Sequence, residues 1–245
     1  MKPPLKLYRY RPLEDALLKR ELCALRDSYL FSPPFKAMND PMEAFYETGG
    51  PGDRIIDAML APSGKRARDL YAIVKAEIDR FGLVSFASTH DDLPIWAHYG
   101  SNFAGMCLEF DTVDLAIGDF QNESLRQVTY ASSALPPLTV ADIAPSERLE
   151  KAVIARITRK RSEWSQEKEW RVITGKVGPK HYLDDGLRRV FLGPRVKSQH
   201  VTQVCEVLDR RPVEVLQGQI KGFELTFRSI KAARPLKECE RVGAG

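Results

Sequence analysis

This 245-residue sequence is poor in the side chains from which metal sites and disulfide frameworks are built. It has four cysteines and four histidines. The cysteines lie far apart and form no CxxC pair, and the histidines lack the HExxH spacing of a zinc protease. We therefore expect neither a zinc site nor a set of disulfides.

Long apolar runs are also absent. The longest run covers residues 70–74, whereas a membrane-spanning helix needs about 20 apolar residues. The first residues, MKPPLKLYRYR, have no apolar core and no small-residue cleavage pattern of a secretory signal. We therefore expect a cytoplasmic protein that does not enter a membrane.

The order of predicted elements favours an α+β fold. Alternating apolar residues predict strands, the first at residues 5–10, and four-residue apolar spacing predicts helices, one of them at residues 67–80. Strands and helices follow neither a regular βαβ order nor an all-β order. We expect a single domain over residues 1–245, with its core at about 5–230 and a mixed, largely antiparallel sheet flanked by helices.

Charge is distributed unevenly along the chain, although the net charge is only +4. Residues 1–120 carry a net charge of −4, and the remainder carries +8. This asymmetry predicts an acidic face and a basic face, the latter suited to phosphate-bearing ligands. It does not distinguish a nucleotide from a nucleic acid.

Polar side chains lie next to aromatic ones in four clusters at predicted strand ends and turns. These clusters are YRYR at 8–11, FSPPFKAMNDPMEAF at 31–45, IWAHYGSNFAGMCLEFD at 95–111 and KRSEWSQEKEWRV at 160–172. Because loops and strand ends commonly carry binding and catalytic residues, we expect the four clusters to converge on one cleft.

Over residues 5–195 the chain resembles the bacterial family DUF2971, a domain of unknown function. That family has a Y-[KR]-Y-R opening, an NDP-x-E loop after a short F-S strand, a W-x-H-Y segment leading to G-x-C-x-E-F-D, and a W-x-x-E-x-E-[WY]-R block. All four motifs are present here in the same order. The resemblance implies no established activity, so the chemistry has to be inferred from the residues.

In the first cluster, strand alternation predicts Tyr8 and Tyr10 on one face and Arg9 and Arg11 on the other. A guanidinium group binds phosphate or carboxylate through paired hydrogen bonds, so Arg9 and Arg11, with Tyr8, are candidate binding or catalytic residues. The alternative is a solvated face of an edge strand.

The second cluster contains a turn and two acidic residues. Asn39 and Asp40 before Pro41 predict an Asx turn and are also candidate binding residues. Glu43 follows Asp40 by three residues, either as an acid that complements a helix dipole or as a catalytic carboxylate. Ser32, at the end of a predicted strand, is a candidate catalytic hydroxyl or an ordinary turn residue.

The third cluster offers an aromatic wall and a histidine. Trp96 and Tyr99 are three residues apart and either line a pocket for a flat ring or pack in the core. His98 is either a general base, because its pKa lies nearest neutral pH, or a structural histidine.

The fourth cluster is the most informative. A strand over residues 167–174 would place Glu167, Glu169 and Arg171 on one face, with the two carboxylates about 7 Å apart. Such a pair suits acid–base chemistry, and Arg171 would keep one carboxylate ionised. The alternative is an exposed ion pair between Glu169 and Arg171 that contributes little.

The order of an arginine strand, an F-S strand and a late E-x-E strand resembles that of the ADP-ribosyltransferases. The resemblance implies that Arg9 or Arg11 orients the phosphates of NAD, that Ser32 is the active-site serine, and that Glu169, with Glu167 ahead of it, assists the loss of nicotinamide. The triplet STS of that family is replaced by SPP here, and SFAST at 85–89 is a rival for the serine segment.

Three classes of function follow from these residues. The first is an enzyme that cleaves NAD or transfers ADP-ribose, in a toxin or phage-defence setting. The second is a protein that binds or processes nucleic acid, or binds a protein target, through its basic C-terminal half. The third is a non-catalytic module for a nucleotide. A nuclease with magnesium on Asp40, Glu43, Glu109 and Asp111 ranks last, because no spacing requires a metal.

Overall fold

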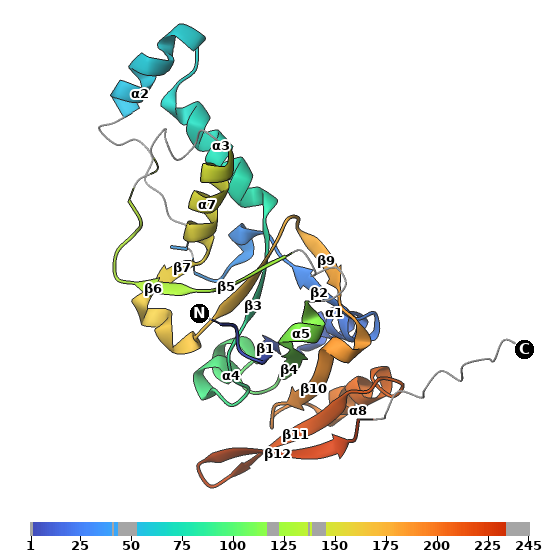
Figure 1. Cartoon of the computed structure of the whole chain (residues 1–245). Helices are drawn as coiled ribbons and strands as arrows, with labels where there is room; N and C mark the ends of the chain where they lie inside the picture. The colour runs from blue at the N-terminus through green and yellow to red at the C-terminus, as the bar shows by residue number, and fades with distance from the viewer. Residues whose placement is uncertain are drawn as a thin grey trace, which may run out of the picture. The chain divides into compact units, whose positions relative to one another are not determined.

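The computed structural model describes residues 2–40, 42–43, 53–116, 123–136, 138 and 146–233 (Figure 1). The sequence predicts a break at residues 49–53 (GGPGD); its first four residues, and Pro41, lie outside the described residues. Contacts divide the chain into two compact units, and each unit is assembled from segments that are distant in the sequence. Unit 1 consists of Phe31–Ser85 and Glu123–Pro179, and unit 2 of Lys2–Leu30, Phe86–Asn122 and Lys180–Gly245.

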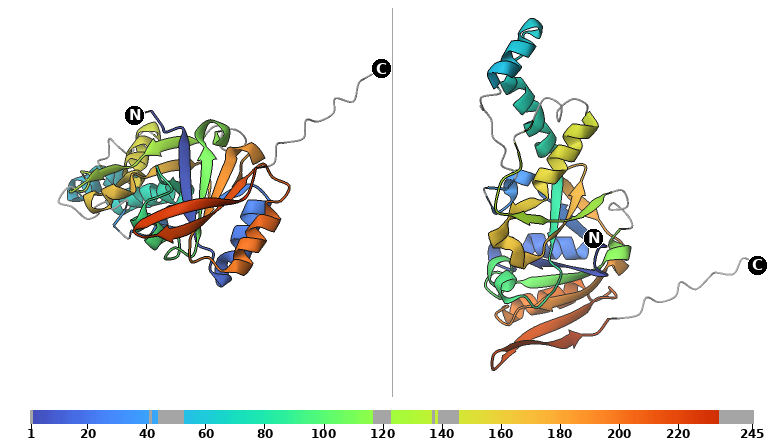
Figure 2. Two further views of the ribbon diagram at one scale, coloured as in Figure 1. Left: turned by 90° about the horizontal axis from the view of Figure 1, so that it is seen from below. Right: turned by 60° about the vertical axis from the view of Figure 1, so that its left-hand side comes forward.

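Unit 2 is built on a five-stranded sheet. Its strand order is β1 (Lys6–Arg11), β4 (Met106–Asp111), β10 (Leu187–Leu192), β11 (Glu214–Lys221) and β12 (Glu224–Lys231). All neighbours are antiparallel except β10 and β11, which are parallel and therefore need a crossover. Helix α8 (Ser198–Val207) supplies this crossover and packs beside α1 (Asp15–Arg26), as Figure 2 shows.

Aromatic side chains fill much of the core of unit 2. Trp96 of α4 (Leu93–Tyr99) is fully buried and meets the ring of Tyr10 edge-on, with 5.1 Å between ring centroids. Its Nε1 donates a hydrogen bond of 2.7 Å to the carbonyl of His90. Because a buried indole needs a partner for its N–H, this bond fixes the ring in the core. The short helix α5 (Thr112–Leu115) follows β4.

Unit 1 combines two small sheets with a pair of packed helices. One sheet has the order β3 (Gly82–Phe86), β8 (Trp170–Thr174), β5 (Ser124–Gln127), and the other pairs β6 (Thr129–Ala131) with β7 (Arg159–Arg161) in parallel. Helices α3 (Ala67–Arg80) and α7 (Ser146–Ile157) lie side by side, with α2 (Asp53–Leu60) beyond α3 (Figure 1). Buried residues four apart join the two helices in one core, which contains Val74, Ile78, Val153 and Ile157.

The remaining elements are short. β2 (Tyr29–Ser32) pairs with β9 (Gly178–His181). Four 3₁₀ helices complete the described chain: η1 (Phe35–Ala37), η2 (Ala61–Ser63), η4 (Ser162–Glu167) and η5 (Asp184–Gly186). The helices that the structure describes are all too short or too polar to span a membrane.

The predicted α+β class, with a mixed and largely antiparallel sheet, is confirmed. The strand predicted at Tyr29–Ser32 is found with the same bounds. Three short strands, β5, β7 and β9, were not predicted, because strands of three or four residues with charged or polar side chains carry little alternation. Contacts divide the chain into two compact units, and the single domain expected over residues 1–245 stays a prediction.

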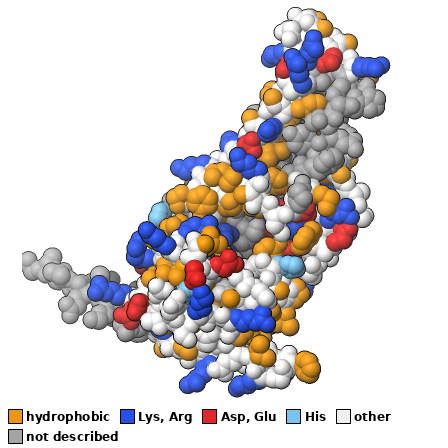
Figure 3. Space-filling view, turned by 180° about the vertical axis from the view of Figure 1, so that it is seen from behind, with side chains coloured by type: hydrophobic (Ala, Val, Ile, Leu, Met, Phe, Trp, Pro, Cys, Tyr) orange, Lys and Arg blue, Asp and Glu red, His pale blue; other side chains and the backbone are white. Residues whose placement is uncertain are grey.

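Charge is balanced between the units, in contrast to the two halves of the sequence. Unit 1 contains 17 basic and 15 acidic residues and unit 2 contains 20 and 18, so each carries a net charge of +2. The asymmetry disappears because each unit takes segments from both halves of the chain. Figure 3 accordingly shows basic and acidic side chains interspersed on the face it displays.

Gly82, at the start of β3, lies where three polar atoms leave no room for a side chain. The sequence predicts this glycine as a helix C-cap, but its conformation is that of a strand residue. A Cβ atom there would lie 2.4 Å from Ser32 Oγ, 2.6 Å from Thr174 Oγ1 and 2.9 Å from the Lys176 carbonyl oxygen. Close packing, rather than a positive φ, therefore requires glycine at this position.

We expect Gly82→Ala to lower the free energy of unfolding by about 1–3 kcal/mol, because the added methyl group overpacks this contact. Gly175→Ala is the matched control, since a Cβ at Gly175 meets nothing within 4 Å. The control should change stability by less than about 0.5 kcal/mol in urea denaturation. Equal stability of the two variants would contradict the packing argument.

Candidate functional site

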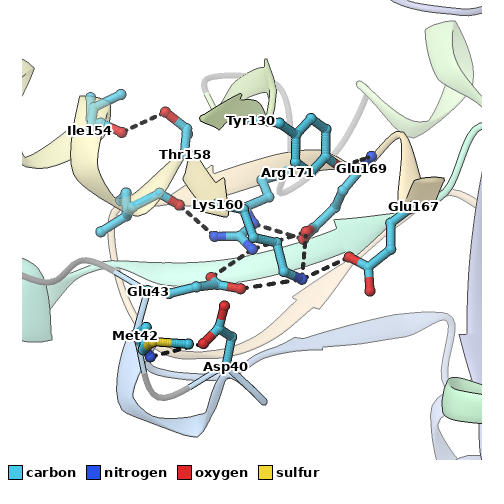
Figure 4. Close-up of polar contacts among 11 residues, drawn as sticks. Asp40, Met42, Glu43, Tyr130, Ile154, Thr158, Lys160, Glu167, Glu169 and Arg171 are labelled. Carbon is cyan, nitrogen blue, oxygen red and sulfur yellow. Dashed lines mark hydrogen bonds and ion pairs between the residues drawn. The ribbon is translucent and has the colours of Figure 1, made fainter. Parts of the chain in front are cut away.

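Lys160 of β7 points into unit 1 and is surrounded by carboxylates (Figure 4). Its Nζ lies 2.7 Å from Glu167 Oε2, 3.2 Å from Glu43 Oε1 and 3.4 Å from Glu169 Oε2. The Lys160 side chain is only 2% exposed. A single ammonium group cannot balance three buried carboxylates, so a second cation is needed.

Arg171 of β8 supplies that second cation. Its Nε and Nη2 donate hydrogen bonds of 2.7 and 2.9 Å to the two oxygens of Glu169. Nη2 also lies 2.7 Å from Glu43 Oε2, and Nη1 donates a hydrogen bond of 2.6 Å to the carbonyl of Ile157. We call the five residues Glu43, Lys160, Glu167, Glu169 and Arg171 the ionic cluster.

The backbone brings Glu167 and Glu169 to Lys160 by a turn, not by the strand that the sequence predicts. Glu167 ends the 3₁₀ helix η4, and Lys168 follows with a φ of 44°, in the left-handed region. The strand β8 begins only at Trp170. The prediction of a strand from residue 167 is therefore wrong, because the turn at Lys168 interrupts the extended backbone.

The ion pair between Glu169 and Arg171 is buried, so the exposed pair that was the alternative is excluded. Arg171 is 1% exposed and Glu169 is 6% exposed. The backbone N–H of Glu169 donates a hydrogen bond of 2.8 Å to the hydroxyl oxygen of Tyr130. Glu169 is thus held by its backbone and by both of its carboxylate oxygens.

Two carboxylates of the ionic cluster, Glu169 and Glu43, have pKa values shifted in opposite directions. Burial by itself raises the pKa of Glu169, but the nearby charges of Arg171 and Lys160 lower it below its usual value. Burial raises the pKa of Glu43 above its usual value, although Arg171 and Lys160 oppose this effect. Opposite shifts in neighbouring carboxyl groups are typical of a proton acceptor and a proton donor.

Asp40 lies beside the ionic cluster and is 5% exposed. Its Oδ1 accepts a hydrogen bond of 2.9 Å from the backbone N–H of Met42, which confirms the predicted Asx turn. Its Oδ2 is buried without a hydrogen-bond partner among the described residues. Asn39, the other candidate of this turn, is exposed.

A pocket of about 280 Å³ opens beside Lys160. Its lining consists of Met42, Ala131, Ser132, Ser133, Ala134, Leu135, Arg156, Arg159, Lys160 and Arg161. Four of these side chains are cationic, and within the described chain none of the lining residues is acidic. Lys160 contributes both to this basic pocket and to the ionic cluster.

Arg159 is the lining residue best placed to meet an anion. Its Nε and Nη2 donate hydrogen bonds of 3.2 and 2.8 Å to the carbonyl of Ser133. Within the residues that the structure describes, no carboxylate lies within ion-pair distance of Arg159, whereas Arg161 pairs with Glu163. The carbonyl of Ser133 therefore fixes the guanidinium group of Arg159 without neutralising its positive charge.

Ser32 lies in unit 1 but takes part in a separate buried contact. Its Oγ is 2.7 Å from Thr174 Oγ1, which itself donates to the carbonyl of Lys176, so Ser32 is the donor. Ser32 is fully buried. Its hydroxyl thus links β2 to the end of β8.

The arginines of the first cluster lie in unit 2 and are not solvated strand residues. Arg9 is 8% exposed, so the solvated alternative is wrong for this side chain. The Nε of Arg11 donates a hydrogen bond of 2.8 Å to Glu21, which is buried. Both faces of β1 are buried, which explains why Tyr8 and Arg9 are both inaccessible.

The remaining candidates also belong to unit 2. Tyr8 donates a hydrogen bond of 3.1 Å to Glu109, and burial together with Glu109 raises the pKa of its hydroxyl. Trp96 is a core residue, whereas Tyr99 is partly buried and packs against the same core. His98 is exposed on α4, and its ring centroid lies 6.4 Å from that of Tyr99.

The four acidic residues weighed as magnesium ligands are divided between the units. Asp40 and Glu43 belong to unit 1, and Glu109 and Asp111 belong to unit 2. Glu109 binds Lys6 at 2.8 Å, and Asp111 accepts backbone hydrogen bonds at the start of α5. Within the described ranges, no three His, Cys, Asp or Glu side chains are grouped to hold a metal ion.

The fold and these side chains define an α+β protein with a buried ionic cluster beside a basic pocket. Residues 95–172 match the family model of DUF2971, described as a protein of unknown function, which confirms the resemblance predicted from the motifs over this part of the chain. The match covers the third and fourth clusters and gives no support to the resemblance to ADP-ribosyltransferases. Neither the curated proteins nor the solved structures contain a match to this chain.

Sequence reasoning identified three members of the ionic cluster in the fourth motif and Glu43 in the second, but it missed Lys160 as their common partner. Lys160 stands in the segment RKR, where three adjacent cations are usually read as a solvated surface. No pattern in the sequence indicates this role; only once β7 is known does strand alternation turn the middle residue opposite to its neighbours.

We expect Lys160→Met to lower the free energy of unfolding by about 3–5 kcal/mol at neutral pH, because it leaves buried carboxylates without their shared cation. Lys151→Met, on the exposed face of α7, is the control and should change stability by less than about 0.5 kcal/mol. Urea denaturation of both variants measures the difference. A decrease of less than about 1 kcal/mol in the free energy of unfolding of Lys160→Met would contradict a central role for this cation.

Proposed function

We propose that this protein is an enzyme that binds a phosphate-bearing nucleotide in the basic pocket of unit 1, with NAD as the first candidate. The observation that carries the proposal is the lining of that pocket, which has four cationic side chains and, among the described residues, no acidic one. Lys160 connects this lining with the carboxylates of the ionic cluster. The same unit therefore provides both an anion-binding surface and acid–base groups.

The chemistry of the lining suits a nucleotide better than a bare anion. Arginine binds phosphate oxygens through planar, paired donors, and Arg159 keeps its charge because a carbonyl anchors it. The hydroxyls of Ser132 and Ser133 add polar groups, whereas Met42 and Leu135 provide an apolar surface. A ligand with phosphate groups and a flat apolar ring would use both kinds of surface.

The ionic cluster supports cleavage of a glycosidic bond. When the bond from nicotinamide to ribose breaks, its electron pair leaves with nicotinamide, and positive charge develops on the sugar. An ionised carboxylate stabilises that charge, and Glu169 is kept ionised by Arg171 and Lys160. Water or another acceptor then adds to the sugar and loses a proton, for which a carboxylate is the acceptor.

A nucleic acid is the second candidate partner. The exposed surface of α7 supports this candidate less strongly than the basic residues in the sequence of the helix suggest. Arg148 and Lys151 are exposed on this helix together with Glu147 and Glu150. Mixed charge weakens attraction to a phosphate backbone. A toxin or phage-defence setting stays a prediction.

A thermal-shift titration with NAD, ADP-ribose and ATP tests the pocket. A nucleotide at 100 times its dissociation constant should stabilise the wild type by about 2.7 kcal/mol, seen as a rise of several degrees in Tm. Arg159→Ala should lose most of this shift. Arg148→Ala removes the same charge from an exposed helix position and should retain it. Shifts that are equal in both variants would contradict the pocket as the binding site, and salt-sensitive binding of RNA alone would favour the second candidate.

Release of nicotinamide from NAD tests the reaction. We expect Glu169→Gln to reduce turnover by at least about 100-fold, because the neutral amide cannot stabilise the developing charge. Glu150→Gln makes the same chemical change at an exposed position and should leave turnover unaltered. Chromatographic detection of nicotinamide measures both rates. Turnover by Glu169→Gln at the wild-type rate would exclude this carboxylate from the reaction.

A further inference from the structure

The ionic cluster carries an excess of negative charge in a buried part of unit 1. With all groups ionised, its three carboxylates and two cations have a net charge of −1, and Asp40 beside it adds a further carboxylate. The side chains of Glu43, Lys160 and Arg171 are at most 2% exposed. Unbalanced charge is costly in such an interior, so the cluster is close to binding a proton.

Lys160 is the physical link between this excess charge and the pocket. It lines the pocket and, at the same time, lies within 3.4 Å of three carboxylates. The ring of Trp164 lies against it, with 4.9 Å between Nζ and the ring centroid. An anion in the pocket would therefore compete with the three carboxylates for the positive charge of Lys160.

We propose that binding of an anionic nucleotide in the basic pocket causes Glu43 to take up a proton. This inference rests on the proposed function, because it needs an anion next to Lys160. The added negative charge weakens the hold of Lys160 on the carboxylates and favours the neutral form of the least stabilised one. In the nucleotide-bound state of the protein, Glu43 is then protonated.

Glu43 is the most deeply buried carboxylate of the ionic cluster, with a side chain that is 0% exposed, against 8% for Glu167 and Glu169. Each of its oxygens meets one nitrogen, Nη2 of Arg171 at 2.7 Å and Nζ of Lys160 at 3.2 Å. Glu169, in contrast, accepts two hydrogen bonds from Arg171. Weakening the contact with Lys160 therefore leaves Glu43 with one cation, whereas Glu169 keeps its paired bonds.

The charged groups around Glu43 come from every described element that packs against it. They are Lys160 of β7, Arg171 of β8, Glu169 before β8, Glu167 of η4 and Asp40 of its own turn. Arg161 of β7 interacts electrostatically with Asp40. Burial, opposed by the two cations, raises the pKa of Glu43, and negative charge added near Lys160 would raise it further.

Calorimetric titration of the whole protein with ADP-ribose tests the proposal. ADP-ribose is a suitable probe because its diphosphate joins two esters and does not titrate near neutral pH. The heat of binding at pH 7, measured in two buffers of different ionisation enthalpy, gives the number of protons exchanged. We expect net uptake in the wild type, at most one proton per ligand, and uptake near zero in Glu43→Gln. Glu150→Gln, an equivalent change on the surface of α7, should retain the uptake.

A second measurement needs only the wild type. If binding takes up a proton, the affinity for ADP-ribose falls as pH rises above neutral, by up to tenfold per pH unit. This readout remains informative if Glu43→Gln does not fold.

The outcomes separate the two proposals. Binding without proton uptake, and with a pH-independent dissociation constant, would overturn the role of Glu43 and leave the nucleotide site intact. Uptake that persists in Glu43→Gln would assign the proton to another group and overturn this inference. Absence of any binding of ADP-ribose or NAD would overturn both proposals.

Discussion

The burial of Lys160 among Glu43, Glu167 and Glu169 is the constraint on which the site depends. One ammonium group holds together side chains from the loop after η1, from η4 and from the segment before β8. Arg171 supplies the second cation and ties the cluster to the end of α7 through the carbonyl of Ile157. Because unpaired charge is so costly in the interior, these contacts restrict the arrangement of the segments that carry them.

The interleaving of the chain explains how the sequence motifs are distributed. The second and fourth clusters meet in unit 1, where they form the ionic cluster, and the first and third belong to unit 2, where they contribute to an aromatic core. Each unit contains segments from both halves of the sequence. The charge asymmetry of those halves is therefore lost, and the basic surface to which the proposal of a nucleotide site refers is the local one around Arg159.

Predictions based on periodicity succeeded where the pattern extends over a whole element. Apolar residues at helical spacing correctly indicated α3, and the alternation over residues 5–10 correctly indicated β1, whose observed bounds are Lys6–Arg11. The pattern failed at residues 167–169, where Lys168 adopts a left-handed conformation, and at β7, whose three charged residues carry no hydrophobic signal. The two-residue spacing nevertheless predicted Glu167, Glu169 and Arg171 on one side of the backbone, and in the structure Glu167 and Glu169 both meet Lys160.

The sequence by itself determined the α+β class, the family resemblance and the residue types available for chemistry, because these follow from local pattern and composition. Only the tertiary structure decided which of those residues act together. Whether a charged side chain is buried in an ion pair depends on partners far away in the sequence. Lys160 and Glu43 are separated by 117 positions, yet Nζ of Lys160 lies 3.2 Å from Oε1 of Glu43. Long-range pairing, burial and the shape of a pocket arise from packing, which no local pattern encodes.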